Sequence, residues 1–293
     1  MIKRTLFLVN SCDCSLRNSQ FVLINKDSGE EHTVPIEDIG YVVVENSRVS
    51  ISIPLMNALV KNNVVISFCD ERHMPSSLLL SMDSNKVQAE VFRYQIEAGA
   101  ALKKNLWKQI VEAKIRNQAS LLSSLNMDGE LLKPYWSNVK SGDSDNREGV
   151  AANLYWDVLF GKGFTRERYG ADPNPLLNYG YSILRAAMCR AIVGSGLVPL
   201  VGLFHKNRYN AFPLADDLME PYRPYVDRSV VRCLEEGLPD LRVDSKKILL
   251  GVLTVDCQFG KVKRPLAIGL SMTTGSLVKC LKGESRQMAL PDY

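Results

Sequence analysis

The chain has 293 residues, of which 46% are hydrophobic and 23% charged, with 36 basic and 32 acidic side chains and a formal net charge of +4. These proportions are typical of globular proteins and exclude a disordered or fibrous chain, and at roughly 150 residues per domain the length predicts two domains. The longest uncharged apolar stretch, residues 191–204, contains glycines and a proline and is shorter than the roughly 20 residues of a membrane-spanning helix. We therefore expect no membrane partner.

The cysteines indicate the cellular compartment in which the protein is found. They number seven, which is odd, and they are scattered along the chain without the spacing of a disulfide framework. Lys3 and Arg4 precede an apolar run that is too short for the core of an export signal. We therefore expect free thiols and a cytoplasmic location. Cys12 and Cys14 lack a second pair at zinc-site spacing, so no zinc site is predicted.

The first part of the chain is rich in β-branched and aromatic runs. Strands are predicted at residues 5–9, 21–24, 39–44 and 64–68, with turn residues between them. Between Ile53 and Asn62 the apolar spacing is helical and Pro54 is tolerated in the first turn, so one helix interrupts the strands. We predict a β-rich domain over residues 1–75 and a linker over residues 76–84.

From residue 85 onward the composition becomes helical. Apolar residues recur at three- and four-residue steps over residues 87–98 and 106–113, and further helices are predicted to begin close to Glu148 and at Pro173–Pro175. Residues 126–147 are predicted as a mobile loop, and residues 255–264 as a hairpin that turns at Gly260. The predicted fold class is α+β, in which a β-rich N-terminal domain is followed by a larger all-helical domain over residues 85–293.

Three acidic residues lie close together in this helical region: Asp216, Asp217 and Glu220. Asp217 and Glu220 are at i and i+3 and share one face of a helix. The residues alone favour an ordinary interpretation by about three to one, in which the acids cap a helix and compensate its dipole. His205, however, lies shortly before them, among cations and amides that are able to hold phosphates. One imidazole with carboxylates suits a hard divalent cation, Mg²⁺ or Mn²⁺, better than zinc or copper.

Longer segments resemble a known family. Residues 176–187 and 205–224 closely resemble the CRISPR-associated spacer integrase family in its type II branch. Residues 147–152 resemble the first metal-ligand motif of that family, and residues 106–110 and 114–118 resemble its early helical segment. From Val226 onward the likeness is looser, with Arg264–Leu266 as its clearest fragment.

This resemblance implies an amino-terminal β-domain for dimerisation and partner binding, followed by a helical catalytic domain. It implies that Glu148, His205 and Glu220 bind Mg²⁺ or Mn²⁺ and that Asp217 is a supporting acid of the catalytic site. The substrates would be double-stranded DNA, namely the prespacer and the CRISPR repeat. The chain would form homodimers that a small companion protein, of the family called "Cas two", bridges into a heterohexamer, and contacts with the type II effector nuclease are a further expectation.

The implied reaction is a transesterification, in which the 3′-hydroxyl end of the prespacer attacks a phosphodiester of the repeat. The DNA supplies the nucleophile, so the chain needs no activated serine or cysteine and has to align oxygens and offset charge on phosphorus. A divalent cation serves this purpose as Lewis acid and template. His205 must be neutral to bind it, and binding is therefore expected to weaken as the pH falls through the imidazole range.

Cations are also needed to hold DNA near this site. Arg208, Arg223 and Lys206 rank first because they lie beside His205 and Glu220 in the sequence. The remaining candidates are more distant basic residues, of which the last three form a peripheral cluster: Arg166, Arg168, Lys261, Lys263 and Arg264.

Two other functions stay open at this stage. A structure-selective endonuclease would use the same ligands to hydrolyse branched DNA, with water in place of the hydroxyl. A non-catalytic DNA-binding scaffold would use the acids as helix caps and pack the histidine. The integrase hypothesis predicts that Glu220→Ala or His205→Ala abolishes the reaction while DNA binding and thermal unfolding change little.

Overall fold

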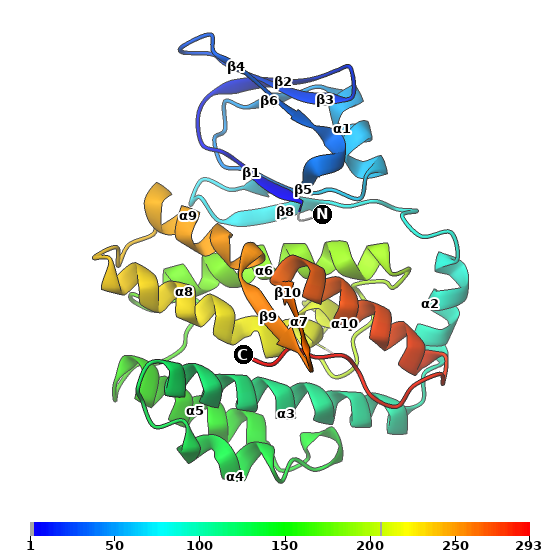
Figure 1. The fold of residues 1–293 in the computed structure, drawn as a ribbon, viewed down its shortest axis with the longest axis vertical. Coiled ribbons are helices and arrows are strands. Elements are labelled where there is room, and N and C mark those ends of the chain that lie inside the picture. Colours follow the sequence, from blue (N-terminus) through cyan, green and yellow to red (C-terminus); the bar gives the residue numbers. More distant parts are fainter. Residues whose placement is uncertain (1–2, 206) are drawn as a thin grey trace.

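The predicted N-terminal strands form two four-stranded sheets in a computed structural model that describes residues 3–205 and 207–293 (Figure 1). One sheet has the order β1-β5-β7-β8 and the other the order β4-β3-β2-β6. The strands are β1 (Arg4–Leu8), β2 (Cys12–Arg17), β3 (Gln20–Asn25), β4 (Glu31–Pro35), β5 (Ile39–Val44), β6 (Ser50–Ile51), β7 (Val65–Cys69) and β8 (Pro75–Leu79). The 3₁₀ turn η1 (Ile36–Asp38) precedes β5, and the predicted helix is α1 (Ile53–Lys61).

Strand β5 connects the two cores of the molecule because it is buried along its whole length. Tyr41 and Val43 belong to the larger core, which they share with the helices. Val42 and Val44 belong to the smaller core, which lies among the strands and α1. Successive side chains of a strand point to opposite faces, so the unbroken apolar run of β5 packs against both parts of the protein.

The predicted linker begins too early. Residues 75–79 form β8, which pairs antiparallel with β7 at the edge of the sheet. Ser76 and Ser77 are exposed while Leu78 packs against the larger core, and this mixed composition shows no clear period in the sequence. The first residues of the segment assigned as a linker therefore belong to the sheet. The domain boundary near residue 85 stays a prediction.

The rest of the chain is largely helical, as predicted. Its α-helices are α2 (Gln88–Glu97), α3 (Ala100–Ser124), α4 (Lys133–Trp136), α5 (Arg147–Phe160), α6 (Asn174–Gly194), α7 (Pro213–Met219), α8 (Arg223–Glu235), α9 (Val243–Leu250) and α10 (Leu266–Leu281). Its 3₁₀ turns are η2 (Glu130–Leu132), η3 (Ser141–Asp143), η4 (Glu220–Tyr222) and η5 (Gly251–Thr254). The segment predicted as a loop over residues 126–147 thus contains short helical turns.

The predicted hairpin is confirmed. Its strands are β9 (Asp256–Phe259) and β10 (Val262–Pro265), which pair antiparallel around a turn where Gly260 has a φ of 57°. The helical part therefore carries one small sheet in addition to the helices. The overall assignment as α+β, with strands first and a larger helical part after them, is confirmed.

Helix α6 runs through the middle of the helical part, beneath the sheet and between the other helices (Figure 1). At Gly180 a Cβ atom would lie 2.4 Å from Cγ1 of Val226, so the absence of a side chain allows α8 to approach α6 closely. Helix α3 contacts α8, η4 and α5. This packing places η4 against α3, next to α7 and α8.

Two features bear on the expectations from composition. No helix within the described residues is long and apolar enough to cross a membrane. All seven cysteines are free thiols, and Cys12 and Cys14 lie buried on the same face of β2.

Candidate active site

Three prolines lie at the starts of the short helical pieces that make up the acidic segment. Pro213 opens α7, Pro221 lies in the first turn of η4, and Pro224 lies in the first turn of α8. Proline is accepted at these positions because its missing N–H would have no helical partner there. The chain consequently passes through three short helical pieces, and every residue from 213 to 222 is buried. Asp216, Asp217 and Glu220 therefore face the interior.

Asp217 fixes the position and orientation of His205. Its carboxylate is fully buried and accepts hydrogen bonds from the backbone N–H groups of Leu203 at 2.6 Å, Phe204 at 3.0 Å and His205 at 3.3 Å. His205 Nδ1 lies 2.5 Å from Oδ1 of the same carboxylate. This hydrogen bond raises the pKa of His205 above its usual value, against the opposing effect of burial. With Nδ1 engaged, Nε2 is the imidazole atom available to a metal ion.

Asp216 has a different structural role. It accepts a hydrogen bond from Arg185 Nε at 2.6 Å and another from Asn210 Nδ2 at 2.8 Å, and so ties the loop before α7 to α6. Among the described residues, no side chain caps the N-terminus of α7, although Asp216 does lie in its first turn, where an acid compensates the helix dipole. The interpretation of these acids as helix caps is therefore wrong, and the scaffold hypothesis loses that part of its pattern.

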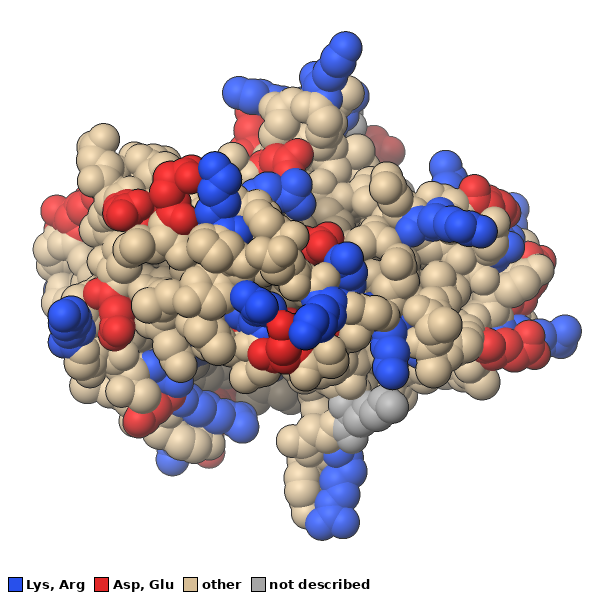
Figure 2. All heavy atoms as spheres, turned by 90° about the horizontal axis from the view of Figure 1, so that it is seen from below, with Lys and Arg blue, Asp and Glu red and all other residues tan. Residues whose placement is uncertain are grey.

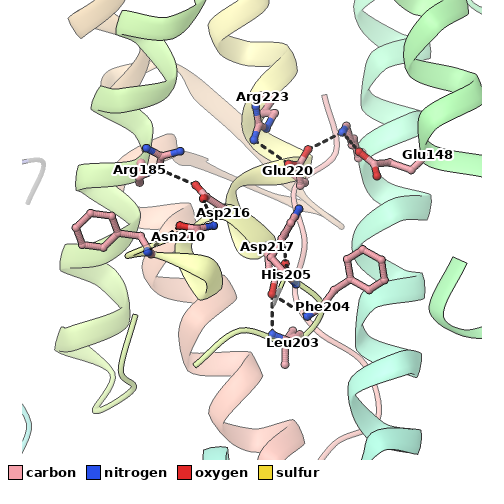
Figure 3. A network of polar contacts seen from close by, with 12 residues as sticks. Glu148, Arg185, Leu203, Phe204, His205, Asn210, Asp216, Asp217, Glu220 and Arg223 are labelled. Carbon is pink, nitrogen blue, oxygen red and sulfur yellow. Dashed lines mark hydrogen bonds and ion pairs between the residues drawn. The ribbon is translucent and has the colours of Figure 1, made fainter. Parts of the chain in front are cut away.

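Glu220 is a buried carboxylate between two cations (Figure 3). Its side chain is 4% exposed, Oε1 lies 2.9 Å from Arg223 Nη2, and Oε2 lies 2.6 Å from Lys114 Nζ. Among the described residues, the Lys114 ammonium is thus the group that lies next to Oε2. Burial alone would raise the pKa of Glu220, but the Arg223 guanidinium and the Lys114 ammonium outweigh it and hold the pKa below its usual value.

Glu148 reaches the same ammonium from α5. The start of α5 is held by Asp143, whose carboxylate accepts the backbone N–H groups of Arg147 at 2.8 Å and Glu148 at 3.1 Å. The Glu148 side chain is 26% exposed and accepts a hydrogen bond from Lys114. Burial disfavours the charged ammonium, but Glu148 and Glu220 raise the pKa of Lys114 above its usual value. Lys114 therefore bridges the two carboxylates as a cation.

The three predicted ligands are not preassembled as a cage. Over the part of the chain that the structure describes, no group of three or more His, Cys, Asp or Glu residues is placed to hold a metal ion. Glu148 and Glu220 meet through Lys114, and His205 meets Asp217. The donor set still fits a hard divalent cation, because it comprises two carboxylates and an imidazole.

A cavity of about 200 Å³ adjoins the two carboxylates. Two buried polar atoms on its lining residues have no hydrogen-bond partner in the described protein: Gln118 Oε1 and Arg223 Nε. Buried polar groups are normally satisfied, so these atoms indicate a site for a polar ligand. The lining residues are Lys114, Gln118, Glu148, Ala152, Trp156, Arg166, Tyr181, Glu220, Arg223 and Asp227.

Asp227 also lines this cavity and was not singled out in the sequence. It accepts hydrogen bonds from the hydroxyl groups of Tyr155 at 2.7 Å and Tyr181 at 2.5 Å, and so joins α5, α6 and α8. Burial raises the pKa of Asp227 to about 6, although the two hydroxyl groups oppose this shift. The network holds the helices that carry Glu148 and Arg223.

The basic residues predicted to bind DNA fall into two groups. Arg166 and Arg223 line the cavity, with their guanidinium carbons 5.2 Å and 4.5 Å from the ring centroid of Tyr181. The others are exposed side chains that do not line it: Arg168, Arg208, Lys261, Lys263 and Arg264. Lys206 lies outside the described residues.

The surface charge does not by itself define a path for DNA. Figure 2 shows basic and acidic side chains interspersed over the face viewed from below. Arg208 lies over the Tyr209 ring at 4.6 Å, and Lys261, Lys263 and Arg264 lie on the β9–β10 hairpin. The site is therefore recognised from the buried charges around the cavity.

Lys114 and Gln118 are the main residues that the sequence analysis left without a role. Both are buried on α3, where they occupy the same inner face as Ile110, Val111 and Ile115. A lysine on the apolar face of a helix is seldom buried without a charged partner. The polar residues on this otherwise apolar helix face were therefore the sequence signal that could have identified Lys114 and Gln118.

Comparisons with known proteins identify the family of the chain. The family model described as CRISPR associated protein Cas1 matches residues 8–246. The CRISPR-associated endonuclease Cas1 of Neisseria meningitidis serogroup C (strain 8013) is 39% identical over 239 residues, which cover 81% of this chain and 78% of that protein.

Solved structures share the fold. A casposase bound to integration product has a TM-score of 0.79 at 19% identity, covering 98% of this chain and 92% of that chain. A Cas6-RT-Cas1–Cas2 complex has a TM-score of 0.75 at 18% identity, covering 99% of this chain and 36% of that chain. The resemblance found in the sequence is confirmed, and the chain belongs to the Cas1 family of CRISPR-associated proteins.

Proposed function

We propose that this chain is a divalent-metal-dependent DNA integrase of CRISPR adaptation that inserts new spacers into the CRISPR array. The observation that carries the proposal is the buried Glu220 carboxylate, which shares the Lys114 ammonium with Glu148 and so lies close to a second carboxylate. His205 adds an imidazole whose Nε2 is left available by the Asp217 hydrogen bond. Membership of the Cas1 family supports the same reaction class.

In this proposal Glu148, His205 and Glu220 hold one Mg²⁺ or Mn²⁺ ion. When bound, such an ion supplies Lewis-acid stabilisation of charge on the phosphate and favours the ionised form of the attacking hydroxyl. Asp217 keeps the imidazole in one tautomer and orientation. An O–P bond forms to the prespacer 3′-hydroxyl while an O–P bond of the repeat breaks, and the proton lost by one oxygen is balanced by the proton gained at the other. Phosphodiester bonds are conserved, so no energy-rich cofactor is required.

Arg166 and Arg223 are proposed to hold the reacting phosphate, and the support is that both line the cavity beside the carboxylates. The unpaired Nε–H of Arg223 offers a donor to a phosphate oxygen. Arg168, Arg208, Lys261, Lys263 and Arg264 are proposed to contact DNA outside the cavity, as is Lys206. Such contacts make DNA binding strongly dependent on salt.

The proposed assembly is a homodimer that joins the companion protein Cas2 and double-stranded DNA in a heterohexamer. One structural neighbour is a Cas6-RT-Cas1–Cas2 complex, which supports the choice of Cas2. Contacts with a type II effector nuclease are proposed from the type II character of the sequence motifs. A cytoplasmic location is proposed because the seven cysteines are free thiols.

An endonuclease that acts on branched DNA is the second candidate, since the curated relative is named as an endonuclease. It would use the same residues and replace the DNA hydroxyl with water. The two activities differ in their products. An integrase joins two DNA strands, whereas the endonuclease leaves only nicks.

The test is strand transfer into a plasmid that carries a CRISPR repeat, with labelled prespacer DNA, Cas2 and Mn²⁺ or Mg²⁺. We expect joined products that require the prespacer 3′-hydroxyl, and a matched 3′-dideoxy prespacer is expected to give none. His205→Ala should abolish joining, while His32→Ala, at an exposed histidine of the N-terminal part, should retain it. Nicks without joining would favour the endonuclease. Joining that persists after exhaustive chelation, or in His205→Ala, would refute the metal site.

A further inference from the structure

A lysine ammonium occupies the space between the two carboxylates that the proposed function assigns to a metal ion. Lys114 projects from α3 with a side chain only 9% exposed, donates to Glu148 Oε1, and lies 2.6 Å from Glu220 Oε2. Two nearby carboxylates repel each other unless a cation lies between them. In the protein without metal, the Lys114 ammonium is that cation.

The structure also contains a second place for this ammonium. Gln118 lies one helical turn after Lys114 on α3, so the two side chains share a face. Both line the same cavity, and Gln118 Oε1 is buried without a hydrogen-bond donor in the part of the chain that is described. A neutral carbonyl oxygen without a donor is a suitable acceptor for a displaced ammonium. Unsatisfied buried polar atoms in native proteins call for such an explanation.

A metal ion and the ammonium cannot both occupy the position between Glu148 and Glu220. Each is a cation, and each needs the same carboxylate oxygens. Arg223 does not take over the role, because it engages the other oxygen of Glu220 at 2.9 Å and lies over the Tyr181 ring. Binding of the ion therefore requires Lys114 to move, and Gln118 is the neighbouring acceptor.

We propose that Lys114 is a positioning residue that holds Glu148 and Glu220 together in the metal-free protein and yields its place to the ion, moving its ammonium to Gln118. The inference rests on the proposed function, since it takes the two glutamates as ligands of a divalent cation. Its consequence is that Lys114 competes with the ion. Lys114 keeps the two glutamates in place when no metal is bound, and it also lowers the affinity of the site for metal because it competes with the ion.

The experiment measures binding of Mn²⁺ alone to the full chain by titration calorimetry, together with the Mn²⁺-dependent shift of the melting temperature. Lys114→Gln removes the competing charge, and we expect Mn²⁺ affinity to rise about tenfold or more. We also expect a lower melting temperature without metal and a larger rise on adding Mn²⁺ than in the wild type. Lys108→Gln, a matched change at a surface ion pair of the same helix, should alter neither quantity. Unchanged or weaker Mn²⁺ affinity in Lys114→Gln would overturn the proposal.

A second variant tests the proposal independently if Lys114→Gln folds poorly. Gln118→Leu removes the acceptor for the displaced ammonium but leaves Lys114 in place. We expect Mn²⁺ affinity to fall about threefold or more in this variant, and to be insensitive to Gln118→Leu when Lys114 is already glutamine. An unchanged affinity in Gln118→Leu would overturn the assigned second position.

The outcomes separate this inference from the proposed function. Tighter Mn²⁺ binding by Lys114→Gln, in a protein that never joins DNA, would support the role of Lys114 and refute the integrase. A wild-type protein that binds no Mn²⁺ at millimolar concentration would refute the metal site and this inference with it. Weaker binding by Lys114→Gln, in a protein that joins DNA, would refute only the role of Lys114.

Discussion

Glu220→Ala is expected to destabilise the protein as well as to stop the reaction. The side chain is 4% exposed and its two oxygens lie beside Arg223 and Lys114. Lys114 retains Glu148 as a partner, but Arg223 loses the one carboxylate with which it forms an ion pair in the described structure. A guanidinium is then left partly buried without a countercharge. The sequence predicted that Glu220→Ala would change thermal unfolding little, whereas the structure predicts a clear loss of stability.

The size of the effect follows from this geometry. Removing one partner of a buried ion pair costs about 3–5 kcal/mol, and the remaining Glu148–Lys114 contact places Glu220→Ala toward the lower part of that range. This is a large share of the roughly 5–15 kcal/mol that stabilises a typical protein. At about 2–4 °C per kcal/mol, the melting temperature should fall by roughly 6 to 14 °C.

Urea unfolding in the presence of a chelator measures this change without any contribution from metal. His205→Ala is the matched variant, because its ring is 38% exposed and Asp217 keeps its three backbone donors. We expect it to cost about 1 kcal/mol while it abolishes activity as completely as Glu220→Ala. If both variants unfold at the wild-type urea midpoint with the same slope, the buried charge network described here is wrong.

Two further predictions concern the pH and the contact between the two parts of the chain. Asp217 raises the pKa of His205 above its usual 6.5, and only the neutral imidazole binds metal, so Mn²⁺ affinity should fall as the pH is lowered through that raised pKa. Asp217→Asn should move the midpoint to lower pH in calorimetric titrations, and an unmoved midpoint would contradict the assigned hydrogen bond. Lys246 of α9 and Glu45, which follows β5, form an ion pair with side chains 3% and 8% exposed. Glu45→Ala should cost about 3–5 kcal/mol in urea unfolding, whereas Glu45→Leu combined with Lys246→Met should cost much less. Strict additivity of the single changes would show that the two residues do not interact.

Much of the secondary structure was predictable because its signals are local. The apolar runs of β5 and β7, the turn at Gly260 and the start of α5 each depend on residues close together in the chain. Strand β8 was missed because an edge strand with exposed serines has no alternating pattern. Its identity depends on pairing with β7, which the local residues do not encode.

The acidic segment shows the limit of local patterns. Asp216 and Asp217 stand where helix-capping acids are common, and that interpretation is wrong because both side chains turn inward to partners on other elements. The prediction that Asp217 and Glu220 lie in a helical segment was correct. What each carboxylate contacts depends on how α6 and the loop before α7 pack against it.

By itself the sequence determined the family, the order of strands and helices, and the residue types able to bind a hard cation. Only the tertiary structure placed Lys114 of α3 between Glu148 of α5 and Glu220 of η4, and buried the nearby Oε1 of Gln118 where no donor from the described residues reaches it. The physical reason is that a buried charge is stabilised by whichever groups the packing of helices brings within a few ångströms. Those groups come from segments that are distant along the chain, so no local pattern reports them.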